Sequence, residues 1–159
     1  MYKILHINGE DYKFEFSVEA SLYSDCVQKI TNIMVDINSG QESSDMKRIL
    51  AGFSDVPSTA VTCFFAGLLE HHGMHEDGDS RVPNLRMAKK LAISMIRDEN
   101  SGIDNWYDIF TLCTEQMGED GFFELIGLGE MLGERKKRPI PIPQDHKKKS
   151  KTKTETSDT

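Results

Sequence analysis

SVEASLYSDCVQKITNIMVDINSG, residues 17–40, is the stretch in which the hydrophobic period changes from that of a strand to that of a helix. Apolar residues recur there at steps of three and four, and the run closes on Asn38-Ser39-Gly40, which is typical of a helix stop. The apolar positions are Leu22, Cys26, Val27, Ile30, Ile33, Met34 and Ile37. The stretch therefore predicts an amphipathic helix of about five turns that starts near Ser17.

Upstream of this helix the pattern alternates between apolar and polar residues, as in a half-buried strand. YKILHI and YKFEF stand on either side of NGED, which contains the Asn8-Gly9 step. Asn-Gly is the residue pair that best tolerates the positive φ angles of a type I′ turn. The sequence predicts a β-hairpin over about residues 2–16.

Downstream of residue 40 the helical period continues in five further apolar segments. They are a short helix over residues 46–53, a helix opened by Pro57 and stopped at Gly73, a helix opened by Pro83, a helix capped by Asp104, and an apolar piece at residues 121–132. The predicted fold class is mainly α: an N-terminal β-hairpin followed by five to six amphipathic helices in a compact bundle.

The composition changes at residue 134, so two regions are expected: residues 1–133 as one helical domain and residues 134–159 as a disordered Pro/Lys-rich tail. The first region carries 22 acidic and 10 basic side chains, whereas the second carries 4 and 9. An acidic body repels nucleic acid, so only the basic tail offers phosphate contacts. No long apolar run or secretory signal is evident, which favours a cytoplasmic location and no membrane contact.

Potential metal ligands are most concentrated in the stretch LLEHHGMHEDGD, residues 68–79. The candidate metal ligands within it are Glu70, His71, His72, His75, Asp77 and Asp79. Two observations argue against a metal site: the order does not fit HExxH, and no glutamate stands twelve positions into an EF-hand-like loop. A solvated helix end followed by a polar loop is the interpretation we favour, with no metal and no cofactor.

Catalytic signatures are absent from the rest of the chain. There is no GxxxxGK loop, no GxSxG elbow and no Cys/His arrangement of recognisable spacing. Cys26, Cys63 and Cys113 lie far apart within helical apolar patterns, which predicts buried free thiols. The sequence therefore predicts no catalytic residues and a nonenzymatic role.

Four segments together resemble the tail assembly chaperones of long-tailed, siphovirus-type phages and prophages of Gram-positive bacteria. They are YKILHINGEDYKFEFSVEASLYSDC, VPSTAVTCFFAGLLEHHG, RVPN and NWYDIFTLCTEQMGEDGFFELIGL. The resemblance implies a small helical protein of the host cytoplasm that binds the tape measure protein and keeps it soluble. It also implies that the protein promotes polymerisation of the tail tube around the tape measure and is absent from the mature virion.

Members of that family are often made in two forms, and ribosomal frameshifting gives the longer form an extension that recruits the tail tube protein. Lys147-Lys148-Lys149 fits this expectation, because consecutive lysine codons can form an adenine run on which a ribosome slips. A Pro-containing spacer of about 3 Å per residue would then hold the appended domain away from the helical body.

Two alternatives stay open at the level of sequence. One is a small metal-dependent enzyme that uses the residue 70–79 cluster, and the other is a nucleic-acid-binding module that acts through the basic tail. The surface that binds a partner is unknown, and homo-oligomer formation is open. Four phenylalanines are candidates for the surface that binds a partner, although apolar aromatics at helical spacing are usually core residues. They are Phe64, Phe65, Phe122 and Phe123.

Overall fold

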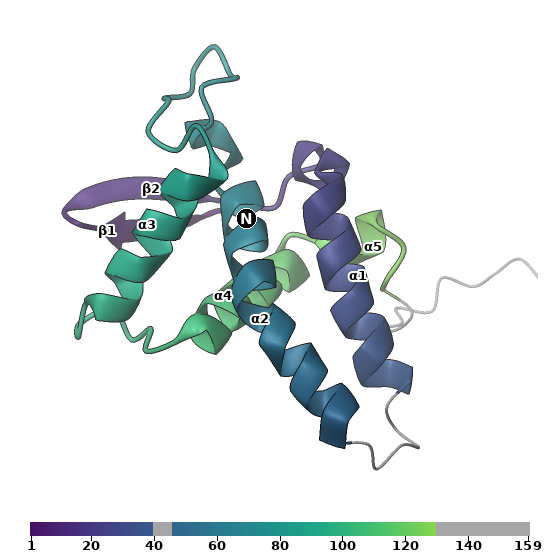
Figure 1. Cartoon of the computed structure of the whole chain (residues 1–159). Coiled ribbons are helices and arrows are strands. Elements are labelled where there is room, and N and C mark those ends of the chain that lie inside the picture. The colour runs from purple at the N-terminus through teal and green to yellow at the C-terminus, as the bar shows by residue number, and fades with distance from the viewer. Residues whose placement is uncertain (40–45, 130–159) are drawn as a thin grey trace, which may run out of the picture.

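The computed structural model describes residues 1–39 and 46–129. It contains one β-hairpin and a set of helices that enclose a single hydrophobic core (Figure 1). The predicted fold class is therefore confirmed. The expected tail, residues 134–159, and the three consecutive lysines lie outside the described residues.

The N-terminal hairpin forms where the alternating pattern predicts it. Strand β1 (Lys3–Ile7) pairs antiparallel with β2 (Glu10–Phe14), and Ile7 lies opposite Glu10. The connecting Asn8 and Gly9 have φ angles of 54° and 77°, as a type I′ turn requires. Leu5, Ile7, Tyr12 and Phe14 face the core, so one face of the hairpin is buried and the other faces solvent.

The first α-helix begins later than the period predicts. A 3-10 helix, η1 (Glu19–Leu22), precedes α1 (Ser24–Ser39), and the extended backbone of Tyr23 separates them. Leu22 was expected on the buried face, but it is 80% exposed. The physical reason is tertiary: the Tyr23 hydroxyl bonds His72 and its ring packs edge-on against Phe65, so the chain turns at Tyr23.

The predicted break before Pro57 is wrong. One helix, α2 (Met46–Gly67), runs straight through Pro57, although proline costs it one intrahelical hydrogen bond. The helix lies at the centre of the molecule and packs against α1, α3 and α4, which compensates for that loss. The inward face expected for residues 46–53 falls on side chains that the structure does not describe.

The remaining helices are capped by asparagine. Helix α3 (Leu85–Arg97) starts after Asn84, and α4 (Trp106–Glu119) starts after Asn105, in each case with the asparagine side chain accepting a backbone N–H. The predicted starts at Pro83 and at the Asp104 cap are thus displaced by one or two residues. A single turn, α5 (Phe122–Leu125), follows.

Aromatic side chains form the centre of the core. Phe14 of β2 and Phe16, which follows the strand, meet Phe64 of α2 and Phe122 of α5, with ring centroids 5.3 to 5.6 Å apart. Phe64, Phe122 and Phe123 are buried, so these three candidates are core residues. The core therefore joins elements from both ends of the described chain.

Candidate functional site

The residue 68–79 cluster does not form the solvated helix end expected from sequence. Helix α2 ends at Gly67, and a 3-10 helix, η2 (Leu69–His71), follows it. Gly73 does adopt the predicted left-handed conformation, with φ of 78°. However, His71 and His72 are only 6% and 7% exposed. This burial comes from long-range contacts with the hairpin and with η1, which a local pattern cannot reveal.

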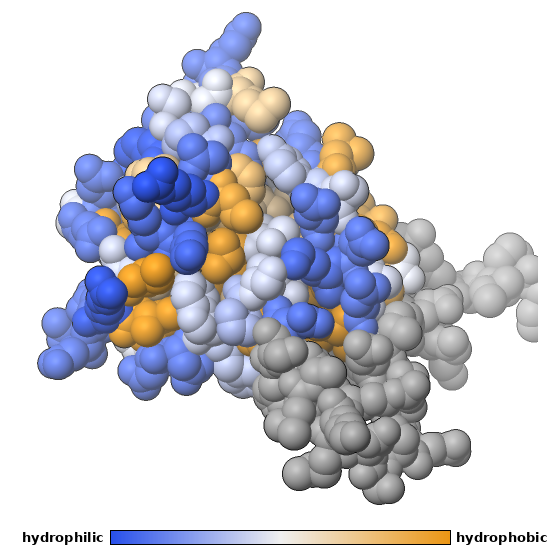
Figure 2. All heavy atoms as spheres, viewed as in Figure 1, coloured by the Kyte–Doolittle hydropathy of each residue, from blue (hydrophilic) through white to orange (hydrophobic). Residues whose placement is uncertain are grey.

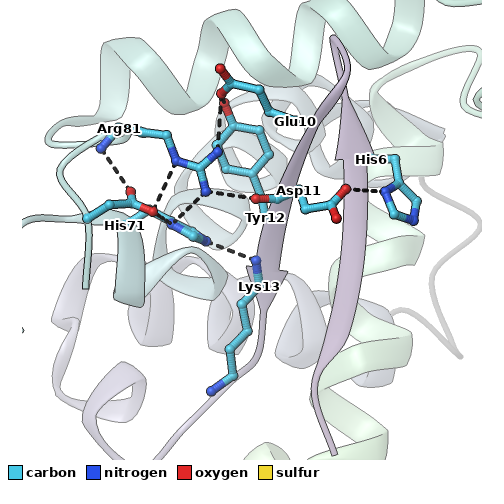
Figure 3. Close-up of polar contacts among 8 residues, drawn as sticks. His6, Glu10, Asp11, Tyr12, Lys13, His71 and Arg81 are labelled. Atoms are coloured by element: carbon cyan, nitrogen blue, oxygen red, sulfur yellow. Dashed lines mark hydrogen bonds and ion pairs between the residues drawn. The ribbon is translucent and has the colours of Figure 1, made fainter. Parts of the chain in front are cut away.

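His71 links the loop to the outer edge of strand β2. Its Nε2 accepts the backbone N–H of Lys13 at 2.9 Å, which leaves Nδ1–H to donate to Asp79 Oδ2 at 2.9 Å (Figure 3). A histidine next to an aspartate can serve as a general base, but only if the other ring nitrogen is free to take a proton. Here the strand occupies that nitrogen, so the pair has a structural role.

Arg81 completes this connection between the loop and the hairpin. Its guanidinium donates to the Asp11 carbonyl oxygen at 2.7 Å, to Glu10 at 3.1 Å and to Asp79 at 3.0 Å. The group also lies 4.3 Å from the centre of the Tyr12 ring (Figure 3). Hydrogen bonds from Tyr12 and from Arg81 lower the pKa of the Glu10 carboxyl. The planar fork of arginine suits this set of acceptors, and lysine could not satisfy all of them.

His72 is held on the other side of the loop, against η1. Its Nε2–H donates to the Phe65 carbonyl oxygen at 2.8 Å, and its Nδ1 accepts the Tyr23 hydroxyl at 3.0 Å. The ring stacks on Phe65 with centroids 3.9 Å apart. Burial lowers the pKa of His72, which favours the neutral ring in the folded protein. Both nitrogens are used, so His72 is not available as a ligand either.

The other three candidates, Glu70, His75 and Asp77, line one hollow on the surface. Glu70 forms an ion pair with Lys13 there. Of the six candidates, the structure brings only His71 and Asp79 into hydrogen-bonding contact. Across residues 1–39 and 46–129, no three His, Cys, Asp or Glu side chains are arranged to hold a metal ion.

The cysteines are buried free thiols, as predicted. Cys26 of α1 and Cys63 of α2 have sulfur atoms 3.4 Å apart, and Cys113 of α4 is fully buried as well. The contact with Cys26 and burial raise the pKa of the Cys63 thiol, and burial raises that of Cys113. A thiol whose pKa is raised is a poor nucleophile, so neither is suited to covalent catalysis.

Two adjoining hollows are the features best suited to binding. The first, which we call the Leu22 groove, has a volume of about 420 Å³ and a mainly apolar lining. It is lined by Glu19, Leu22, Tyr23, Leu69, Met74 and His75. Leu22 and Met74 are 80% and 77% exposed at its rim. Figure 2 shows apolar surface over η1 and over the loop that follows η2, within a mostly polar face.

The second, which we call the acidic hollow, has a volume of about 300 Å³ and shares Glu19, Leu69 and His75 with the groove. Its five carboxylates are Glu15, Glu19, Glu70, Glu76 and Asp77. Lys13 pairs with two of them, Glu15 and Glu70. The other three have no ion-pair partner within the described residues, so the hollow favours cationic groups.

Sequence reasoning missed the Leu22 groove because it assigned Leu22 to the buried face of a continuous helix. The only local signal was Met74, an isolated apolar residue in an otherwise polar loop. Comparison of the chain with protein-family models, with curated proteins and with solved structures finds no match. None of the helices in the described part of the chain has the length and apolar character needed to span a bilayer.

Proposed function

We propose that this chain is a nonenzymatic binding protein, a phage tail assembly chaperone that holds a tape measure protein soluble in the host cytoplasm. The observation that carries the proposal is the Leu22 groove, because it places exposed apolar side chains from two separate segments around one concave surface. Concave apolar surfaces with a polar rim are the usual sites at which a protein covers an apolar segment of a partner.

The acidic hollow beside the groove supports a partner that carries basic residues. An amphipathic helix could lay its apolar stripe against Leu22, Leu69 and Met74. Lysine or arginine residues that border that stripe would then face Glu19, Glu76 and Asp77. We therefore propose that the chaperone binds a helical tape measure segment whose apolar face is flanked by basic residues.

The resemblance also leads us to propose that the tail tube protein is a second partner, recruited by a frameshifted longer form. No observation on the described residues favours a metal-dependent enzyme, since no three His, Cys, Asp or Glu side chains among them are arranged to hold a metal ion. Nucleic-acid binding through the tail falls on residues outside the described range. The tape measure proposal is consequently the one to test first.

The test is coexpression with the tape measure protein of the same gene cluster, with the soluble fraction and copurification as readouts. The groove variant is Leu22→Glu with Met74→Glu, which places charge on the apolar rim without touching the core. The matched control is Tyr107→Glu, an exposed aromatic position (56%) that lines neither hollow.

We expect the wild-type chain and the control to keep the tape measure soluble, and the groove variant to lose that activity. Tape measure that aggregates with the wild-type chain would overturn the chaperone function. Full activity in the groove variant would overturn the assignment of the surface. A third variant, Glu76→Gln with Asp77→Asn, is expected to weaken the complex mainly at low salt, because charge attraction is screened as salt rises.

A further inference from the structure

The two edges of the hairpin differ in how their backbone groups are used. On the outer edge of β2, Lys13 N–H donates to His71, Glu15 N–H donates to the Gly67 carbonyl, and the Asp11 carbonyl accepts from Arg81. This edge is therefore closed by the loop and by the end of α2. An edge closed in this way cannot accept another strand.

The outer edge of β1 is open. Because the backbone groups of Asp11 and Lys13 point away from β1, the residues opposite them, His6 and Ile4, point theirs away from β2. Within the described residues, no group bonds the backbone N–H or carbonyl of Ile4 or His6. Ile4 is 40% exposed.

Helix α3 packs against β1, but the hydrogen bonds that hold the hairpin to the helices lie at its two ends. At the open end, Asp120 after α4 accepts from the Met1 amino group and from Phe16 N–H, both at 2.8 Å. At the turn, Asn8 donates to Ser94 of α3 at 3.2 Å. In Figure 1 the hairpin projects to the left of the helices, and β1 forms its lower border.

We propose that the free edge of β1 pairs antiparallel with the β1 edge of a second copy of this chain. The pairing is centred on Ile4, so that Ile4 faces Ile4 of the second copy and Tyr2 faces His6. All three residues present outward backbone groups, since they alternate with the inward-bonded Lys3, Leu5 and Ile7. The two hairpins then join into one four-stranded antiparallel sheet.

The side chains select this register over its neighbours. A shift of the centre by one position aligns either Lys3 with Lys3, which leaves His6 unpaired, or Leu5 with Leu5, which leaves Tyr2 without a partner on the strand. Like charges directly opposite each other destabilise a pair of strands, whereas two isoleucines pack well. The register centred on Ile4 avoids the pairing of Lys3 with Lys3 and uses every outward group from Tyr2 to His6.

A dimer held by five residues of each strand is expected to be weak and reversible, because its interface is small. Sedimentation velocity on the full chain, from about 5 to about 500 µM, should show a concentration-dependent increase in mass. Amide hydrogen exchange gives the site. The Ile4 and His6 amides should become protected as concentration rises, whereas the Leu5 and Ile7 amides bond within the hairpin and should be protected throughout.

The decisive variant is Ile4→Glu, compared with Ile4→Gln. Within one chain the new carboxylate faces Lys13, the residue opposite, so the hairpin is retained. In the dimer two carboxylates oppose each other, and the dissociation constant should rise about tenfold relative to Ile4→Gln. A wild-type chain that stays monomeric, or a dimer whose Ile4 and His6 amides exchange freely, would refute the proposal. Equal dissociation constants for the two variants would also refute it.

Discussion

Gly67 is a position at which adding one methyl group should cost stability, because the new atom would enter the closed core. A Cβ atom there would lie 2.3 Å from Cε2 of Phe14 and 2.9 Å from its Cζ, far inside van der Waals contact. The Phe14 ring is 0% exposed and is flanked by Phe16 and Phe64 at centroid distances of 5.4 and 5.6 Å, so it has no space to retreat. Overpacking a closed core in this way costs about 1–3 kcal/mol.

Alanine also favours a helix over glycine, by up to about 1 kcal/mol in a helix interior and by less at the last residue of α2. The net expectation for Gly67→Ala is a loss of about 2 kcal/mol in the free energy of unfolding. With a urea slope of about 2 kcal/mol per molar, the unfolding midpoint should fall by about 1 M. Equilibrium urea unfolding, followed by circular dichroism, measures this shift.

Gly118 supplies the matched control. It lies within α4, and a Cβ there meets no atom within 4 Å, so Gly118→Ala should raise the free energy of unfolding by up to about 1 kcal/mol. In the double variant Gly67→Ala with Phe14→Leu, the smaller leucine side chain makes room for the new methyl group. Part of the loss caused by Gly67→Ala should then be recovered, so the effects of the two substitutions on the free energy of unfolding should be non-additive. An unchanged midpoint for Gly67→Ala, or an equal loss for Gly118→Ala, would refute the packing argument.

Three further predictions concern the buried His72, the half-buried Arg81 and the thiols. Burial lowers the pKa of His72, so the unfolded chain takes up a proton at a higher pH than the folded chain does, and the free energy of unfolding should fall as pH drops below about 6.5. The fall should be smaller in His72→Gln. Equal slopes of the free energy of unfolding against pH for the two chains would contradict this. Arg81→Met should lower the free energy of unfolding in urea by about 1–2 kcal/mol, because it removes charged hydrogen bonds to β2 and to the loop. Arg81→Lys should recover only part of that free energy. Full recovery with lysine would show that charge alone matters. The three cysteine thiols should react with a disulfide reagent only at the rate of unfolding, and a fast reaction in native buffer would contradict their burial.

Local sequence was sufficient wherever the structure depends on neighbouring residues. The Asn8-Gly9 turn and the strands beside it follow from positive φ tolerance and from alternation, both of which act over a few residues. The inward faces of α3 and α4 likewise follow from their period. The exact first residues of these helices could not be predicted from the sequence, since an asparagine cap and a nearby proline or aspartate give similar local signals.

The tertiary structure decided everything that depends on contacts between distant segments. Tyr23 meets His72 across 49 positions, and this contact turns the chain, exposes Leu22 and creates the apolar groove. His71 reaches Lys13 across 58 positions and thereby closes one edge of the hairpin while the other stays open. The sequence by itself indicated which segments are strands and which are helical, apart from the join at Pro57 and the turn at Tyr23, because hydrophobic period and turn chemistry are local. Only the fold determined which polar and apolar groups remain free to bind, because that depends on which partners the rest of the chain has already supplied.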